Sequence, residues 1–295
     1  MSVAQAGQAR RMPAWFKQEI PSAEAWENIR LLADLKVNTV CQEARCPNLS
    51  RCFVERELTF MILGSSCTRS CRFCAVDKAV EADLSVDAGE PERIAEAVVR
   101  LRLDYAVLTS VTRDDLSDGG AGHFARTIKS IRARCENICL EALIPDFQGS
   151  ISSIKTVVRA SPQVLAHNLE TIRRLSCELR PQADYDRSLA VLRLAKQDSS
   201  TLITKSSLML GLGETLEEVV ETTQELKNTG CEILVLGQYL APSAGHYPVK
   251  EFIDREEFIK YREIAFSLGL KGVSSGPLVR SSYQAKDLYR RALNV

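Results

Sequence analysis

The chain has 295 residues, 45% of them hydrophobic, and 38 Lys and Arg residues balance 38 Asp and Glu residues. This length allows a sizeable core in one large barrel domain or in two smaller domains, and the balanced charge excludes a global field that would attract nucleic acid or anionic lipid. No stretch has the apolar run of a signal peptide or the roughly 18 to 20 apolar residues of a membrane span. We therefore expect a cytoplasmic protein with no nucleic-acid and no membrane partner, and we expect a monomer.

The first part of the chain, residues 1–59, is predicted to be an N-terminal extension. Ser22 follows a proline and can cap a helix over residues 23–36. The segment after that helix carries three cysteines and lacks the alternation of a strand. We expect this extension to pack against the main domain.

Residues 60–269 alternate short apolar runs with longer amphipathic stretches. Buried strands are predicted at 60–64, 105–110, 138–145, 164–170, 202–213 and 231–239. Helices are predicted at 92–103, 123–134, 188–196, 216–230 and 255–269. Thr215 and Glu218 fit a capping box at the start of one helix, Gly230 fits its end, and Asp254 fits the cap of the next.

Six strand–helix units in succession predict a parallel sheet with helices outside it. Periodicity alone leaves two closures open, a partial barrel and a doubly wound sheet. Residues 270–295 follow the last predicted helix, and we expect them to form a C-terminal extension that crosses back over the structure.

Two triplets hold six of the ten cysteines, namely Cys41, Cys46 and Cys52, then Cys67, Cys71 and Cys74. In a chain without a secretory signal, clustered cysteines bind metal or do redox work more often than they form disulfides. A structural zinc site is closed by four ligands, and each triplet is one ligand short. Three thiolates can hold three irons of a 4Fe-4S cluster and leave the fourth iron open. Iron–sulfur ligation is therefore favoured, with zinc and disulfides as the alternatives.

The second triplet lies in CTRSCRFC, directly after a predicted strand, at the end where parallel barrels and sheets build active sites. Its spacing, with Phe73 before the last cysteine, resembles the signature of the radical S-adenosylmethionine superfamily. The resemblance implies the α/β class and a partial (β/α)6 TIM-type barrel with N-terminal and C-terminal extensions. It also implies a 4Fe-4S cluster on Cys67, Cys71 and Cys74, whose open iron binds S-adenosylmethionine for cleavage to methionine and a 5′-deoxyadenosyl radical.

A longer series of motifs narrows the resemblance to the lipoyl synthase family. The order of that family is matched over residues 41–283 by CQEARCPNLSRC, TFMILGSSCTRSCRFCAV, TSVTRDDLSDGGAGHFA, PDFQG, TKSSLMLGLGET, GQYLAP and GPLVRSSY. The family implies an auxiliary 4Fe-4S cluster on the first triplet. Its RSSY motif implies a serine as the fourth ligand, here Ser281 or Ser282, and we favour Ser282. Because a serine oxygen is a poorer partner for iron than a thiolate, we expect this corner to open during sulfur donation.

The resemblance also implies the reaction. The family inserts two sulfur atoms at carbons 6 and 8 of an octanoyl chain that is amide-linked to a lysine of a lipoyl carrier domain or glycine-cleavage H protein. Two S-adenosylmethionine molecules are consumed, and the auxiliary cluster supplies the sulfur. The two clusters are then expected to face each other across the barrel mouth. The implied partners include an electron donor such as flavodoxin or ferredoxin and an iron–sulfur carrier protein.

Contacts to S-adenosylmethionine are expected from family motifs and from polar residues at or near strand ends. The candidates are Phe73, Thr109, Ser110, Arg113, Glu141, Asn168 and Lys205. Asn168 and Lys205 could bond ribose hydroxyls and a carboxylate, and structural hydrogen bonds are the alternative. Asp114, Asp115 and Asp118 precede two glycines, and we expect them to cap a helix instead of forming a catalytic dyad.

Two other interpretations fit the sequence less well. A radical enzyme with another acceptor, as in methylthiolation or biotin formation, places its second cluster differently from a triplet ahead of the radical motif. A metal-stabilised module that binds nucleic acid lacks the basic, aromatic stripe that such binding requires. Departures from the family motifs, such as Ser207 where glycine is usual, concern substrate fit and loop geometry instead of cluster binding.

Overall fold

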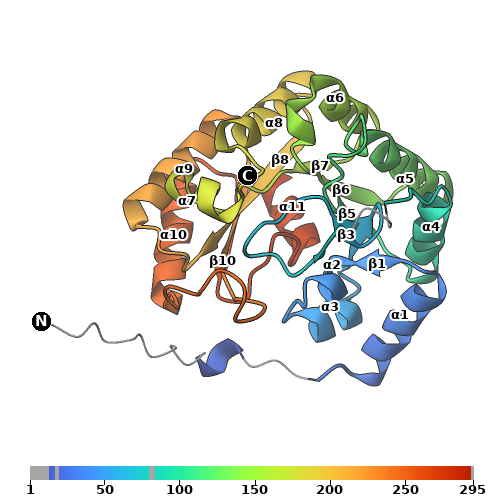
Figure 1. Ribbon diagram of the computed structural model, residues 1–295, viewed down its shortest axis with the longest axis horizontal. Coiled ribbons are helices and arrows are strands. Elements are labelled where there is room, and N and C mark those ends of the chain that lie inside the picture. Colours follow the sequence, from blue (N-terminus) through green and yellow to red (C-terminus); the bar gives the residue numbers. More distant parts are fainter. Residues whose placement is uncertain (1–12, 17–19, 80–83, 294–295) are drawn as a thin grey trace, which may run out of the picture.

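The computed structural model describes residues 13–16, 20–79 and 84–293. Its centre is an eight-stranded sheet in the order β1-β2-β5-β6-β7-β8-β9-β10. From β2 onward neighbouring strands are parallel, and β1 pairs antiparallel with β2 at one edge. The sheet curves into an open barrel with a ring of helices outside it (Figure 1). The prediction of a partial TIM-type barrel is therefore confirmed, and the doubly wound alternative is excluded.

The strands of the large sheet are β1 Asn38–Thr39, β2 Thr59–Ile62, β5 Tyr105–Ser110, β6 Cys139–Leu143, β7 Val164–Ala166, β8 Ile203–Leu210, β9 Ile233–Gln238 and β10 Gly272–Gly276. A separate parallel pair consists of β3 Ser66–Cys67 and β4 Asp77–Lys78. The α-helices are α1 Ala23–Asp34, α2 Val40–Glu43, α3 Leu49–Glu55, α4 Glu90–Arg100, α5 Ala121–Arg134, α6 Ile151–Arg159, α7 Arg173–Leu179, α8 Tyr185–Asp198, α9 Leu216–Asn228, α10 Arg255–Ser267 and α11 Ala285–Leu293. Two short 3-10 helices are η1 Ala14–Phe16 and η3 Phe147–Gly149.

The apolar runs form strands because both of their faces are buried. All residues of β2 and β9 are buried, as expected for parallel strands covered on two sides. In β5 the side chains of Ala106 and Leu108 pack into the core under the outer helices. Tyr105 and Val107 point the other way, into the barrel lumen, where they contact α11 through Ala285 and Tyr289.

The predicted caps at Ser22 and Thr215 are formed, whereas Asp254 precedes α10 without a side-chain capping hydrogen bond. Ser22 accepts a hydrogen bond from the backbone N–H of Ala25, and the reciprocal capping box between Thr215 and Glu218 is formed. Gly230 follows the end of α9 in the left-handed region, with φ at 88°. Helices α6 and α7 were not predicted from the sequence.

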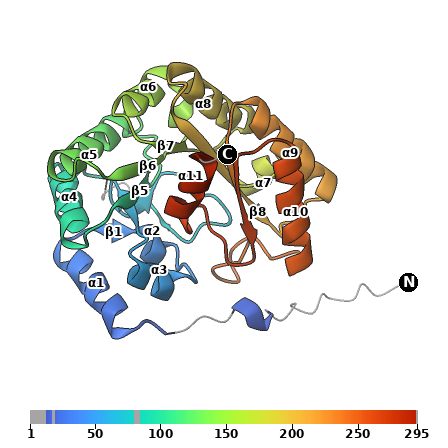
Figure 2. The same ribbon diagram turned by 180° about the vertical axis from the view of Figure 1, so that it is seen from behind.

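The tail is more than an extension that crosses the surface. Residues Gly272–Gly276 form β10, which pairs in parallel with β9 and continues the barrel. Helix α11 then enters the lumen, where both views place it inside the ring of strands (Figures 1 and 2). Its Leu288 and Ala292 pack on the first residues of β7, β8 and β9. The helix therefore occupies part of the amino-terminal end of the barrel, beside β7, β8 and β9.

The N-terminal extension forms the β1 edge of the sheet, and β10 forms the other edge. Strand β1 continues directly into α2, and helix α1 contacts α3. These two short helices, α2 and α3, carry the first cysteine triplet beside β2. Within the described residues, no helix is both long and apolar enough to cross a bilayer.

Candidate active site

The loop after β2 carries Cys67, Cys71 and Cys74 at the carboxyl end of the parallel strands. The sulfur of Cys67 accepts backbone N–H bonds from Arg69 and Thr112, each at 3.4 Å. The remainder of the loop is bonded to distant segments, since the N–H of Arg72 donates to the carbonyl of Leu179 in α7 at 2.9 Å. The three thiols are therefore held at the end of the barrel where a ligand can reach them.

The electrostatics of this triplet suit an iron cluster. The pKa of Cys71 is raised to about 11, chiefly by burial; Arg180 lowers it, and Cys74, Glu170 and Cys67 add smaller upward effects. Burial also raises the pKa of Cys74. Such groups are costly to ionise without a cation close by, and bound iron supplies that positive charge. The donor set therefore fits a cluster held by three thiolates.

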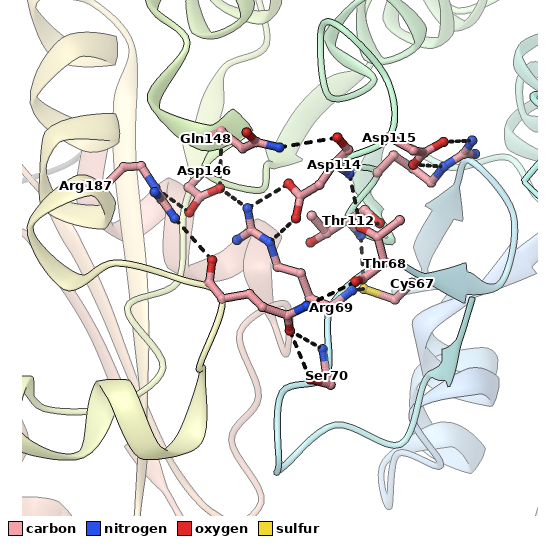
Figure 3. Close-up of polar contacts among 12 residues, drawn as sticks. Cys67, Thr68, Arg69, Ser70, Thr112, Asp114, Asp115, Asp146, Gln148 and Arg187 are labelled. Carbon is pink, nitrogen blue, oxygen red and sulfur yellow. Dashed lines mark hydrogen bonds and ion pairs between the residues drawn. The ribbon is translucent and has the colours of Figure 1, made fainter. Parts of the chain in front are cut away.

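Arg69 ties this loop to two neighbouring loops through a buried ion network (Figure 3). Its side chain is only 4% exposed. The guanidinium donates to both carboxylate oxygens of Asp114, at 2.6 and 2.8 Å, and to Asp146 at 2.7 Å. Because Asp114 follows β5 and Asp146 follows β6, one side chain joins three strand ends around the cluster loop.

The carboxylate of Asp146 is shared between two arginines. Arg187 of α8 donates to its second oxygen at 2.8 Å, and the backbone N–H of Gln148 donates to the first at 3.1 Å. Burial opposes the ionisation of Asp146, but the hydrogen bond and the charge of Arg69 outweigh it and hold the pKa of this carboxyl well below its usual range. The side chains of the network are thus paired and fixed.

Among the expected S-adenosylmethionine contacts, Thr109, Ser110 and Asn168 lie at carboxyl ends of strands. Thr109 donates its hydroxyl to the carbonyl of Leu143 at 2.9 Å. The Ser110 hydroxyl is buried with no hydrogen-bond partner among the described residues. The Asn168 amide donates to Glu170 at 3.0 Å. Phe73 packs against the apolar cluster around α9 and β9.

Two expected contacts lie elsewhere, because Glu141 and Lys205 sit inside β6 and β8 and not at their carboxyl ends. The Lys205 ammonium donates to both oxygens of Glu141 at 2.7 and 2.9 Å, and the Tyr105 hydroxyl donates to Glu141 at 2.7 Å. Glu141 and Lys205 are each 1% exposed. The predicted position of these two residues at the strand ends is therefore wrong. Both side chains are buried within the lumen because each provides the other's counter-charge.

The guanidinium of Arg113 donates its hydrogen bonds to other groups of the protein. It forms a two-point ion pair with Asp115, at 2.8 and 2.7 Å, and donates to the carbonyl of Leu84. Asp118 accepts backbone N–H bonds from Gly120 and Gly122, both at 2.8 Å, at the start of α5. The expected helix cap is thus confirmed for Asp118 and wrong for Asp114 and Asp115, which pair with arginines.

Three side chains near the cluster loop were not singled out from the sequence. Glu170 follows β7, and burial raises its pKa, while Arg180 and the amide of Asn168 lower it. Arg180 of the α7 end donates to the carbonyl of Leu169 at 3.0 Å and faces Cys71. The Nδ1 atom of His167 lies 2.8 Å from the carbonyl of Ile144, and its Nε2 is buried without a partner among the described residues. No sequence signal distinguished them, because the predicted strand 164–170 contained His167 and Glu170, and the helix that ends beside Arg180 was not predicted.

The first triplet lies at the other end of β2. Cys41 and Cys52 are buried, and Cys46 is partly buried. Burial and, to a smaller extent, the thiol of Cys46 raise the pKa of Cys41 to about 12, against the lowering effect of a hydrogen bond from the backbone N–H of Thr59. Arg280 of the tail faces Cys46 and lowers its pKa against the larger effect of burial. The three sulfurs are therefore neighbours, with one cation beside them.

The two serines of the tail face in different directions. The hydroxyl of Thr59 donates to that of Ser282 at 2.6 Å, so Ser282 lies on the side of Cys41. The hydroxyl of Ser281 donates to the side-chain oxygen of Asn168 at 2.9 Å, on the side of the cluster loop. Asn48, between the cysteines of the first triplet, donates to the carbonyl of Leu278 at 2.6 Å and fixes the tail there.

Across the described ranges, no three His, Cys, Asp or Glu side chains converge closely enough to hold a single metal ion. The thiolates of a 4Fe-4S cluster each bind a different iron, so a cluster needs a wider spacing than one ion does. Both triplets offer three buried or half-buried thiols and one facing arginine, a donor set that fits a cluster and not a mononuclear site.

Sequence comparisons identify relatives of this chain. A family model described as "Radical SAM superfamily" matches residues 61–226, and one described as "N-terminal domain of lipoyl synthase of Radical_SAM family" matches residues 2–46. The chain is 48% identical to a lipoyl synthase of Thermus thermophilus, over 96% of this chain and 88% of the relative. It is 51% identical to a lipoyl synthase of Geotalea uraniireducens, over 94% of this chain and 97% of the relative.

Solved structures agree on the fold. A crystal structure of methylornithine synthase matches with a TM-score of 0.58 and 13% identity, over 90% of this chain and 80% of that one. A maturase of the FeFe-hydrogenase matches with the same TM-score and 14% identity, over 92% of this chain and 67% of that one. At such low identity these matches establish the barrel alone.

Proposed function

The chain belongs to the lipoyl synthase family of the radical SAM superfamily, and from this premise we propose that it inserts two sulfur atoms, at carbons 6 and 8, into an octanoyl chain. The acyl chain would be amide-linked to a lysine of a lipoyl carrier domain or glycine-cleavage H protein. Two 4Fe-4S clusters and two S-adenosylmethionine molecules would serve one complete reaction.

One observation carries this proposal: the two cysteine triplets flank the same short strand. Thr59, the first residue of β2, donates its backbone N–H to Cys41, whereas Cys67 follows the carboxyl end of β2. The four residues of this strand extend for about 10 Å. Two clusters held there would lie at opposite ends of one side of the lumen, within reach of an acyl chain between them.

We assign the cofactor-binding cluster to Cys67, Cys71 and Cys74. With S-adenosylmethionine bound at its open iron, this cluster would supply the 5′-deoxyadenosyl radical that removes hydrogen from an unactivated carbon. Asn168, Glu170 and Arg180 contribute polar groups beside the thiols, and we propose that they orient the amino acid part and the ribose. Arg69 keeps the loop in place while they do so.

We assign the sulfur-donating cluster to Cys41, Cys46 and Cys52, with Ser282 as the fourth ligand. Ser282 is preferred over Ser281 because Thr59 contacts both Ser282 and Cys41, whereas Ser281 is bonded to Asn168. An oxygen ligand is harder than a thiolate and holds iron less tightly. Ser282 would thus be the weakest ligand of that cluster, and iron would be released there most easily as sulfur is donated.

The proposal includes partners of three kinds. The octanoylated carrier domain brings the substrate, and flavodoxin or ferredoxin would deliver electrons to the first cluster. An iron–sulfur carrier protein would restore the second cluster after each reaction. We propose that the chain works as a cytoplasmic monomer.

The direct test is an anaerobic assay with reconstituted protein and an octanoyl-lysine peptide. We expect 5′-deoxyadenosine and a peptide whose mass shows two added sulfur atoms. Cys67→Ala should abolish 5′-deoxyadenosine, whereas Cys46→Ala should retain some of it and add no sulfur. The opposite pattern would reverse the assignment of the two sites, and a peptide of unchanged mass with the wild-type protein would refute the function.

A further inference from the structure

A pocket of about 270 Å³ opens at the amino-terminal end of the barrel, where three distant segments meet. Its walls are the end of α3 with the start of β2, the turn between α4 and β5, and the start of α11. These elements lie around the lower part of the lumen in Figures 1 and 2. The proposed function assigns no role to this opening.

The floor of the pocket is apolar and its rim is charged. Buried side chains form the floor, namely Leu58, Leu103, Tyr105, Val107 and Ala285. Charged side chains form the rim, namely Glu55, Arg56, Arg102, Asp104, Lys286 and Asp287. An apolar floor below a polar rim suits a ligand whose inner part is a hydrocarbon chain and whose outer part is solvated.

The pocket leads to the place where sulfur would be added. Ser282 lines it, and the neighbouring Thr59 contacts both Ser282 and Cys41. Val107 lies opposite Thr59 in the register of β5 and β2, and its side chain faces the lumen. A chain that entered here would therefore pass the proposed serine corner before it reached the upper lumen.

Hydrogen bonds join the loops at the carboxyl-terminal end of the barrel. The N–H of Tyr247 donates to the carbonyl of Arg72 at 2.9 Å, and His246 contacts the carbonyl of Cys74 at 3.2 Å. The N–H of Ser70 donates to Gln182 at 2.6 Å. The cluster loop is thus bonded to segments from two other parts of the chain, and this end is also where the proposed function places S-adenosylmethionine.

We propose that the pocket admits the acyl-lysine arm of the carrier domain, with the hydrocarbon chain over Leu58, Leu103 and Val107 and the lysine backbone at the charged rim. The inference rests on the proposed function and adds the direction from which the substrate comes. The carrier then docks on the face formed by α3, the α4–β5 turn and α11, and S-adenosylmethionine binds from the opposite end.

The first test maps the position of the substrate. An octanoyl-lysine peptide with a benzophenone residue next to the lysine is irradiated with the reconstituted protein, and the cross-linked residues are identified by mass spectrometry. We expect cross-links at the rim, around Arg56, Arg102 and Lys286, which an excess of peptide without benzophenone suppresses. Cross-links on the loops around Gln182 and His246 would overturn the inference.

The second test narrows the pocket at its floor. Leu103→Trp should raise the KM for the octanoyl peptide by roughly tenfold or more, without a matching fall in kcat. Ile259→Trp, on the exposed face of α10, is the matched control and should leave the KM unchanged. An unchanged KM in a folded Leu103→Trp protein contradicts the entry route.

The results distinguish an error in the entry route from an error in the proposed function. If wild-type protein adds sulfur to the peptide but the cross-links lie at the carboxyl-terminal loops, the entry route is wrong and the proposed function stands. If wild-type protein cleaves S-adenosylmethionine and adds no sulfur, the proposed function is wrong, and this inference falls with it.

Discussion

At the scale of single residues, Arg69 is the clearest case of a charge that organises the site. It is buried, and all its pairing is with two carboxylates from neighbouring strand ends (Figure 3). Removing one member of such a buried network leaves the others uncompensated, at a cost of about 3–5 kcal/mol. Arg69 therefore couples the position of Cys67 and Cys71 to the barrel itself.

Replacing Arg69 by lysine should weaken the cluster loop, because lysine keeps the charge but cannot bond Asp114 at two points. We expect lower iron retention and a changed electron paramagnetic resonance signal of the reduced cluster on addition of S-adenosylmethionine. Arg174→Lys is the control, since the Arg174–Glu218 pair lies on the surface, where solvent screens the attraction between the two charges. Equal iron retention in both variants would show that the network does not hold the loop.

His167 provides a prediction about pH. Burial, together with the charge of Arg180, lowers its pKa from 6.5 to about 4. Between these two values the unfolded chain takes up a proton that the folded chain does not, so stability is complete above pH 6.5 and declines as the pH falls toward 4. The decline amounts to about 3 kcal/mol at most. Anaerobic urea unfolding should show a shallower pH dependence for His167→Gln than for the wild type, and parallel curves would contradict this.

The two tail serines can be separated by substitution. Ser282→Ala should reduce the iron of the second cluster and abolish sulfur insertion, because it removes the proposed fourth ligand beside Thr59. Ser281→Ala is the matched control and should keep the full iron content, since it breaks only the bond to Asn168. If Ser281→Ala lost the iron and Ser282→Ala kept it, the ligand would be Ser281.

Residue identities alone predicted some of this site and not the rest. The cysteine spacings indicated the two triplets, because thiolates one ligand short of closure have few other uses. The roles of Glu141 and Lys205 could not be predicted, since their pairing depends on two strands that meet across the lumen. Arg69 gave no signal of its own, because its carboxylate partners lie 45 and 77 positions away in the chain.

At the scale of elements, apolar runs predicted the strands well, and the segment Tyr105–Ser110 has the predicted bounds. Strand β7 ends at Ala166, four residues earlier than predicted, because the chain leaves the sheet at His167. Strand β10 was missed, since GVSSG has little apolar character and its pairing with β9 comes from the tertiary fold. Gly272 of β10 packs closely against Ile233 and against Ala292 of α11, so a larger side chain at this position would clash with α11.

Gly237 marks the point where the tail crosses β9. A Cβ atom at this position would lie 2.1 Å from the carbonyl oxygen of Val279, so Gly237→Ala must displace the tail. We expect a loss of about 1–3 kcal/mol in stability and reduced iron at the second cluster, because the displaced tail carries Ser282. Gly245→Ala is the control, since its Cβ would meet nothing nearer than 3.7 Å. Thermal melting with iron analysis measures both effects, and equal behaviour of the two variants would contradict this account of the tail.

At the scale of the whole molecule, the N-terminal extension and the C-terminal tail both contribute residues to the same side of the barrel. The N-terminal extension brings three cysteines to β2, and the tail returns through the lumen and places Arg280 and Ser282 beside them. The barrel in turn supplies the other triplet at its carboxyl-terminal end. Such an arrangement would hold the two proposed clusters on one lumen without a separate domain, and it would leave the space between them for the substrate.

The count of iron and sulfide per chain after anaerobic reconstitution tests this arrangement most directly. Two complete 4Fe-4S clusters predict about eight irons and eight sulfides per chain. Substitution of either triplet by alanine should leave about half of each. A wild-type count of about four irons that the loss of one triplet leaves unchanged, or bound zinc without sulfide, would contradict the two-cluster account.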